Sequence, residues 1–226
     1  PLYRQAGVDC VFVGHPLLDH IASTEPVPAP QSGMVVGLLP GSREQEIQRH
    51  MPIMVDVAAG ILKAHPEARF VIPCVDERRE KQVQSLAGDF PVRTVVGGTY
   101  DTLASARLCL VASGTATLET AMFGVPMLIL YKTSSFNYRI ARSVVRIKHI
   151  GLANIVAGRE IVPEFIQHEA CCEKVLPAAL ELMDDTPRRA RMLADLAEVR
   201  HALGEGGASA RAAQAVLEIA GRTRHA

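Results

Sequence analysis

The feature that most constrains this chain is a series of short, uninterrupted apolar runs, each followed by a segment with helical character. Runs typical of buried strands lie at residues 34–39, 69–75, 92–96, 108–112 and 126–131. The segments expected to be helical after them lie at 43–64, 76–87, 101–106, 115–123 and 135–147. Because consecutive positions in the runs are apolar, they predict a parallel sheet covered by helices on both faces. The expected fold is α/β, a Rossmann-like doubly wound parallel sheet.

The ends of the chain have a different pattern. Residues 9–14 read as one more buried strand, and the stretch after them, which contains four prolines, reads as a linker. Further helices are expected at 168–184, 187–203 and 208–220. We therefore expect three parts: the end of one domain and a linker at 1–32, a Rossmann-like domain at 33–205, and a C-terminal helix and tail at 206–226.

The overall composition narrows the possible functions. The 226 residues have a formal net charge of zero, so we expect no nucleic-acid partner held by overall charge. No apolar run approaches the ~18 residues of a membrane span. The five cysteines show no CxxC spacing and fit a reducing cytosol.

The first corner of interest follows the run at 34–39. Ligands of doubly wound sheets bind beyond the carboxyl ends of the strands, which is where Gly41, Ser42 and Arg43 lie. Gly41 allows close approach of the backbone, Ser42 can cap the next helix, and Arg43 offers a fork of donors to phosphate. An ordinary strand-to-helix turn with a serine cap fits the same residues equally well.

A second corner of the same kind follows the run at 108–112. Ser113, Gly114 and Thr115 end the strand, and a helix begins at once. Glu119 lies one helical turn further on, where its carboxylate could accept two hydrogen bonds from a ribose diol. For Glu119 alone, compensation of the helix dipole or simple solvation is the commoner role.

Other familiar signatures are missing from the sequence. It contains neither GxGxxG nor GxxxxGK[ST], which argues against a standard dinucleotide fold and a P-loop. His15, Asp19 and His20 are potential metal ligands, but they lie in the linker-like stretch. We expect no metal and no cofactor.

Four ordered motifs resemble those of one known family. They are VGHPLLD at 13–19, LLPGSREQEI at 38–47, SGTATLETAMFGVPMLILYK at 113–132 and GLANIVAGREIVPEFIQ at 151–167. Together they resemble lipid-A-disaccharide synthase, an inverting glycosyltransferase of GT-B type, over nearly the whole chain. PGSR or SGTATLE alone would be shared by wider groups of sugar-nucleotide enzymes.

The resemblance implies a reaction and a set of site residues. The reaction transfers 2,3-diacylglucosamine from its UDP donor to 2,3-diacylglucosamine 1-phosphate, giving lipid A disaccharide 1-phosphate and UDP. The implied UDP-binding residues are Gly41, Ser42, Arg43, Ser113, Gly114, Thr115 and Glu119, with Arg43 also stabilising the leaving group; Asn154, Glu164 and Gln167 are placed near the cleft floor and the donor.

One departure from the family is large. Pro1 is not an initiator, and only the last strand of the family's N-terminal domain is expected, at 9–14. We therefore expect that domain, with its general base, to be largely missing and the fragment to be inactive alone. A UDP-sugar epimerase of the same fold and a non-catalytic UDP-binding fragment remain alternatives.

The segment 132–149 offers a possible membrane contact. Its apolar residues recur at helical spacing, and its arginines line another face. Packing on the sheet explains the apolar stripe, while the basic face could lie on anionic lipid. The expected location is cytoplasmic, peripheral at the inner membrane of a Gram-negative bacterium.

Overall fold

The computed structural model describes residues 2–22, 34–134 and 148–223 of the chain. The chain divides into two compact units. One joins Pro1–Pro26 with His201–Ala226, and the other comprises Val27–Arg200. The expected three-part division at 32/33 and 205/206 stays a prediction.

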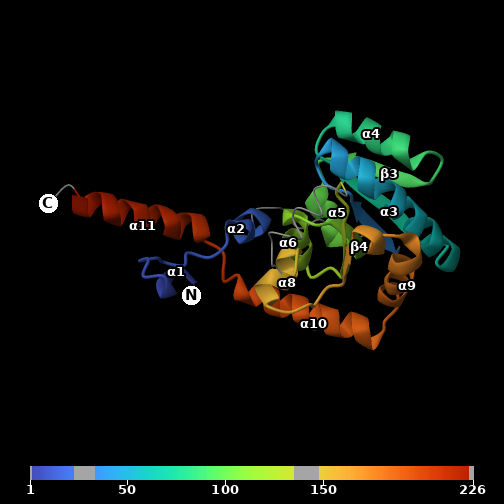
Figure 1. The fold of residues 1–226 in the computed structure, drawn as a ribbon. Coiled ribbons are helices and arrows are strands. Elements are labelled where there is room, and N and C mark those ends of the chain that lie inside the picture. The colour runs from blue at the N-terminus through green and yellow to red at the C-terminus, as the bar shows by residue number, and fades with distance from the viewer. Residues whose placement is uncertain (1, 23–33, 135–147, 224–226) are drawn as a thin grey trace. The chain divides into compact units, whose positions relative to one another are not determined.

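The larger unit is built on a six-stranded sheet in the order β3-β2-β1-β4-β5-β6 (Figure 1). Its strands are β1 Val35–Leu39, β2 Arg69–Cys74, β3 Val92–Val96, β4 Ala106–Ala112, β5 Met127–Tyr131 and β6 Glu164–Ile166. All neighbouring strands are parallel. The predicted doubly wound parallel sheet is confirmed, because the chain moves outward in one direction from β1 to β3 and in the other from β4 to β6.

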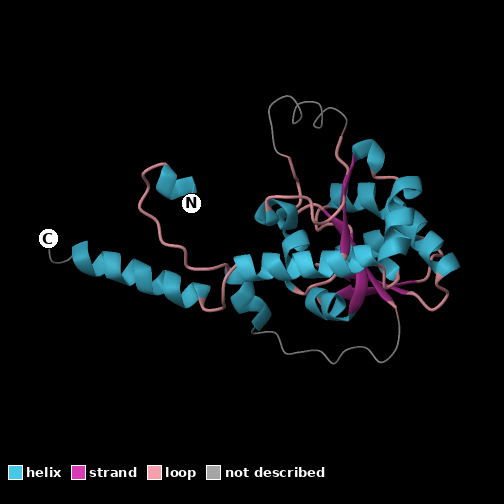
Figure 2. Cartoon of the chain, turned by 90° about the horizontal axis from the view of Figure 1, so that it is seen from below, coloured by secondary structure: helices cyan, strands magenta, loops and turns pink. Residues whose placement is uncertain are grey.

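Helices cover both faces of this sheet (Figure 2). They are α3 Glu44–Ala64, α4 Glu77–Ala87, α5 Thr99–Ser105, α6 Thr115–Met122, α8 Leu152–Ala157, α9 Cys172–Met183 and α10 Pro187–Ala202, with a 3-10 turn, η1, at Gln167–Glu169. α3 packs against α4 and α9, whereas α6 packs against α8. If all crossovers are right-handed, the helices that connect β1, β2 and β3 lie on one face of the sheet. Those that connect β4, β5 and β6 then lie on the opposite face.

The core lies between the sheet and these helices. All five residues of β1 are buried, and Leu38, Leu110 and Leu128 have no exposed surface. Neighbouring strands are also tightly packed, because a Cβ on Gly37 of β1 would lie 2.7 Å from the Sγ of Cys109, its register partner on β4. The continuous apolar runs of the sequence are therefore the buried strands, as predicted.

Two expectations about the N-terminal stretch are wrong. Residues 9–14 form no strand: Phe12 is 70% exposed, and the carbonyl oxygen of Cys10 accepts its hydrogen bond from the Arg4 side chain. The linker-like stretch contains a helix, α2 Pro16–Ala22, because proline is tolerated at a first helical position. Residues 23–33 and the expected helix at 135–147 lie outside the described residues.

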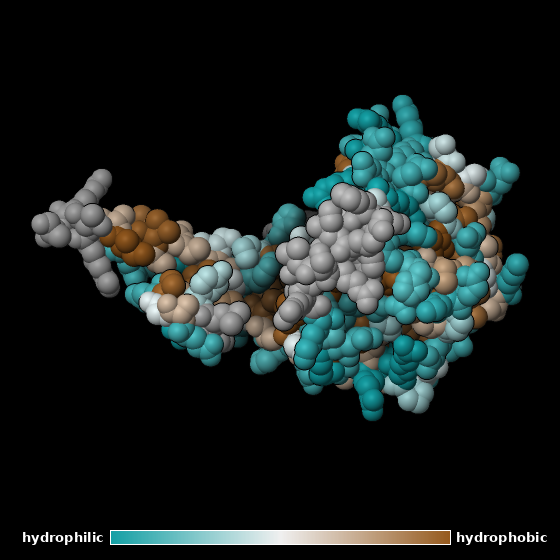
Figure 3. All heavy atoms as spheres, viewed as in Figure 1, coloured by the Kyte–Doolittle hydropathy of each residue, from teal (hydrophilic) through white to brown (hydrophobic). Residues whose placement is uncertain are grey.

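The smaller unit contains α1 Leu2–Gln5, α2 and α11 Ala208–Thr223. The Asp19 carboxylate caps α11, accepting the N–H groups of Gly207, Ala208 (3.1 Å) and Ser209 (2.8 Å). These bonds, chiefly the one from Ser209, lower the pKa of Asp19 to about 2. Asp19 is thus a helix cap. On α11, the exposed residues Val216, Leu217 and Ile219 contribute to the apolar area visible in Figure 3.

Candidate functional site

The two corners singled out in the sequence lie side by side in the structure. β1 and β4 are adjacent parallel strands, and Leu39 is the register partner of Val111. β1 ends at Leu39 and β4 at Ala112, so Gly41 and Ser113 follow the ends of these strands closely. This is also the point where the strand order reverses, which is the usual ligand position in doubly wound sheets.

The first corner is shaped by Gly41 and closed by Glu46. Gly41 has a φ of 106°, and a Cβ there would lie 2.5 Å from the Glu46 carboxylate. Glu46 accepts hydrogen bonds from the backbone N–H (3.3 Å) and Nη1 (2.8 Å) of Arg43, whose side chain is 82% exposed. Arg43, not Ser42 as expected, is the N-cap of α3, because Glu46 satisfies its N–H.

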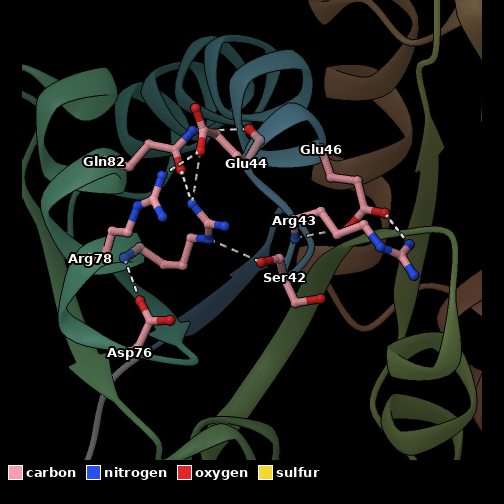
Figure 4. Close-up of polar contacts among 8 residues, drawn as sticks. Ser42, Arg43, Glu44, Glu46, Asp76, Arg78 and Gln82 are labelled. Atoms are coloured by element: carbon pink, nitrogen blue, oxygen red, sulfur yellow. Dashed lines mark hydrogen bonds and ion pairs between the residues drawn. The ribbon is translucent and has the colours of Figure 1, made fainter.

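A second helix holds this corner from the side (Figure 4). From α4, Arg79 donates through Nε to the carbonyl oxygen of Ser42 at 3.3 Å and through Nη1 to Glu44. Arg78 pairs with the same Glu44 carboxylate at 3.0 Å, and Gln82 donates to the Glu44 carbonyl at 2.9 Å. The backbone from 42 to 44 is therefore fixed by side chains that follow the neighbouring strand β2.

The second corner is held by hydrogen bonds at Ser113 and is exposed to solvent at the two residues that follow. The Ser113 backbone N–H donates to the Leu130 carbonyl at 2.9 Å, and its hydroxyl donates to the Ile150 carbonyl at 3.0 Å. Gly114 and Thr115 are exposed at the start of α6. The first N–H groups of a helix have no intrahelical acceptor, so this corner presents donors and the positive end of a helix dipole.

Glu119 lies half-buried on α6, one turn beyond Thr115. The Tyr100 hydroxyl lies 3.5 Å from its Oε1. Burial and this carboxylate together raise the pKa of Tyr100. Tyr100 lies on α5, which precedes β4, and Glu119 lies on α6, which follows it. Sequence spacing therefore could not have paired them.

Asn154 and Glu164 use their polar atoms to hold backbone. Asn154 is fully buried; it accepts the N–H groups of Ile161 and Val162 at 2.9 Å and donates to the Val162 carbonyl and to Glu164 at 2.8 Å. Glu164 also accepts the N–H groups of residues 150 and 151 at 2.9 Å. All four hydrogen-bonding positions of the Asn154 amide are filled.

Gln167 differs from these two residues. Its φ of 54° is the one left-handed value recorded for a non-glycine residue in the described parts of the chain. Its Oε1 accepts the Thr133 N–H at 3.3 Å, while its buried Nε2 has no hydrogen-bond partner among the described residues. A strained backbone with an unused buried donor is a common mark of functional positions.

The structure has a groove that lies away from the strand ends of the candidate site. An open groove of about 730 Å³ runs along β2, β3 and α5, and its lining contains none of the predicted site residues. Within residues 2–22, 34–134 and 148–223, no three His, Cys, Asp or Glu side chains gather as metal ligands. In the same ranges no helix combines the length and apolar character needed to span a membrane.

Several solved structures share the fold of this chain. The UDP-GlcNAc 2-epimerase of Neisseria meningitidis, bound to UDP-GlcNAc, matches 82% of this chain and 45% of its own (TM-score 0.54, 17% identity). The spinosyn rhamnosyltransferase SpnG, complexed with thymidine diphosphate, matches 82% and 46% (TM-score 0.54, 19% identity). At such identities the likeness establishes the fold alone, one shared by sugar-nucleotide epimerases and glycosyltransferases.

The sequence comparisons are more specific. The chain belongs to the lipid-A-disaccharide synthetase family, whose family model matches residues 1–219. The lipid-A-disaccharide synthase of Syntrophus aciditrophicus is 39% identical over 229 residues, which cover 97% of this chain and 60% of that protein. The predicted family is therefore confirmed, and the chain spans about 60% of the length of the curated relatives it matches.

Proposed function

We propose that the edge formed by residues 41–43 and 113–115 binds the diphosphate of a UDP-sugar donor. The observation that carries this proposal is the register of Leu39 with Val111, which brings two strand-to-helix corners together at the switch point of the sheet. Two helix N-termini and the exposed Arg43 guanidinium suit a diphosphate. Glu119, one turn into α6, is the proposed ribose ligand.

The reaction proposed is that of the family. The acceptor hydroxyl of 2,3-diacylglucosamine 1-phosphate attacks the anomeric carbon of UDP-2,3-diacylglucosamine with inversion. The bond to the β-phosphate oxygen breaks, and its electron pair stays on the departing UDP. The products are lipid A disaccharide 1-phosphate and UDP. A base must take the acceptor proton, and we assign that role to none of the residues described.

Arg43 is the proposed stabiliser of the leaving group. Negative charge grows on the β-phosphate as the glycosidic bond breaks, and donors fixed in advance at that position lower the barrier. In the structure the guanidinium is paired with Glu46 at 2.8 Å. Binding of the donor would therefore exchange the Glu46 carboxylate for a phosphate oxygen.

The residues after β5 have supporting roles in this proposal. Asn154 and Glu164 shape the backbone beneath the second corner, since their polar atoms are already engaged there. Gln167 is proposed to turn toward the donor sugar, because its buried Nε2 is unused among the described residues.

The decisive test of the site is UDP binding to this chain by calorimetry. Replacing Glu119 by Ala should weaken binding by about 1.5–3 kcal/mol, the usual worth of charge-assisted hydrogen bonds. Glu119→Gln should retain part of the affinity. Glu67→Ala, in the connection between α3 and β2, is the matched control and should bind as the wild type does. Equal affinity of the Glu119→Ala and wild-type proteins would remove the ribose assignment.

An epimerase activity is the second candidate, because a UDP-GlcNAc 2-epimerase shares the fold. A chimera in which this chain replaces the matched region of the Syntrophus aciditrophicus enzyme separates the readings. Disaccharide 1-phosphate as the product supports the transferase, and an epimerised UDP-sugar supports the epimerase. UDP binding without either product would indicate a binding fragment.

The acylated substrates imply work at a membrane surface, and we propose a cytoplasmic, peripheral location. The segment 132–149, of which 135–147 lie outside the described residues, is the proposed contact with anionic lipid. Co-sedimentation with anionic vesicles should weaken when Arg139, Arg142 and Arg146 are replaced by Glu. Binding that ignores these changes would exclude the segment.

A further inference from the structure

A buried histidine joins two strand ends that are not neighbours in the sheet. His50, on α3, is 2% exposed. Its Nδ1 lies 3.0 Å from the carbonyl oxygen of Pro40, the residue before Gly41. Its Nε2 accepts the backbone N–H of Lys132, the first residue after β5, also at 3.0 Å. β4 lies between β1 and β5, so this link passes the strand that ends at Ala112, just before Ser113.

The two partners fix the protonation of the ring. A backbone N–H can only donate, so Nε2 carries no hydrogen; a carbonyl oxygen can only accept, so Nδ1 carries one. Burial lowers the pKa of His50, which favours this neutral form, although the nearby Glu46 acts in the opposite direction. One tautomer is thus built into the fold.

The link reaches both sides of the candidate site. On one side it holds the peptide that leads into residues 41–43. On the other it holds Lys132, whose neighbour Thr133 donates to Gln167. Through these contacts the ends of β1, β5 and β6 are tied into one frame around the end of β4.

We propose that His50 is a positioning residue for the donor corner: its bond to Pro40 fixes the peptide that leads into residues 41–43, and its bond to Lys132 holds the ring in place. This inference rests on the proposed function. Its role is separate from catalysis, because the ring is buried and both of its nitrogens are engaged.

Three variants of this chain test the proposal, each removing a different contact. His50→Asn places an amide near Nδ1 and can keep the bond to Pro40. His50→Gln places one near Nε2 and can keep the bond to Lys132. His50→Leu keeps neither. His65→Gln, at the end of the same helix, is the matched control.

UDP affinity is the first measurement. We expect His50→Asn to bind within about threefold of the wild type, and His50→Gln and His50→Leu to bind about tenfold more weakly, since one lost bond misplaces the corner. His65→Gln should bind normally. If His50→Leu does not fold, the difference between the Asn and Gln variants decides the matter. Equal affinity of all folded variants would overturn the proposal.

Nitrogen NMR of the ring is the second measurement, and it needs no ligand. We expect hydrogen on Nδ1 alone, and amide shifts at Gly41 and Ser42 that change in His50→Gln but much less in His50→Asn. A hydrogen on Nε2, or unmoved corner amides in His50→Gln, would overturn the positioning role. If the wild type fails to bind UDP while these signals appear as expected, the proposed function fails, but the role of His50 in positioning residues 41–43 stands.

Discussion

The Nε of Arg79 lies 3.3 Å from the carbonyl oxygen of Ser42, although the two residues belong to different strand–helix units. A peptide whose carbonyl is held in this way cannot rotate freely, so the backbone of the first corner has one preferred orientation. The Arg79 side chain is 19% exposed and reaches Ser42 from α4.

Replacing Arg79 by Ala should therefore weaken UDP binding, because the Ser42 carbonyl loses the side chain that holds it. The loss of one hydrogen bond to the corner predicts an affinity about threefold to tenfold lower. Arg78→Ala is the control, because Arg78 shares the Glu44 pair but does not reach Ser42. Calorimetry on both variants checks this; an equal loss in both would assign the effect to Glu44.

Replacing Glu46 by Gln should strengthen UDP binding. The carboxylate lies next to the position that a Cβ on Gly41 would take, and it pairs with Arg43. It therefore competes with a phosphate for the space beside Gly41 and for the Arg43 guanidinium. The amide keeps an acceptor for the Arg43 N–H but removes the charge. We expect affinity to rise by about twofold to fivefold, the scale of an exposed ion pair, and the gain to shrink with added salt. Weaker binding would show that the carboxylate supports the site.

Replacing Asn154 by Leu should destabilise the larger unit strongly. The change leaves buried backbone groups of residues 161 and 162 without partners, each costing about 1–3 kcal/mol. Urea denaturation should show a loss of at least ~3 kcal/mol. Ile155→Ala, at a half-exposed position of the same helix, is the control. A midpoint unchanged by Asn154→Leu would contradict the buried network.

The cap of α11 should respond to acid. The pKa of Asp19 is about 2 in the folded unit against its usual 3.8, so the carboxylate stabilises the fold fully above pH ~4. That contribution is lost as the pH falls from 4 toward 2. The protection factor of the Ser209 amide, which corrects for the intrinsic pH dependence of exchange, should fall across this window in the wild type. In Asp19→Asn the protection factor should be lower already at neutral pH and vary less with acid; an identical profile would refute the cap.

The central strands could be predicted because burial on both faces leaves a continuous apolar run. Residues 34–39 and 126–131 were expected as strands, and β1 and β5 occupy nearly the same positions. β6 was not expected, since it has only three half-buried residues and begins with Glu164. At 9–14 an apolar run misled the prediction, because no described strand pairs with it.

The site was predictable only where its residues are close in sequence. The corners at 41–43 and 113–115 carry glycine, small polar residues and a helix start, which are visible in the sequence. Their adjacency follows from the strand order. The contact of Arg79 with Ser42 and that of His50 with Lys132 depend on how helices pack against the sheet, over separations of 37 and 82 residues.

The smaller unit has a consequence for the order of assembly during translation. The Asp19 carboxylate accepts the N–H of Ser209, 190 residues further along the chain, and Arg211 donates to the Val13 carbonyl at 3.0 Å. Residues 9–19 are synthesised long before their partners, and the whole of Val27–Arg200 lies between them in the sequence. The sheet can thus collapse first, and residues 13–19 can join residues 207–211 only after those later residues have been made.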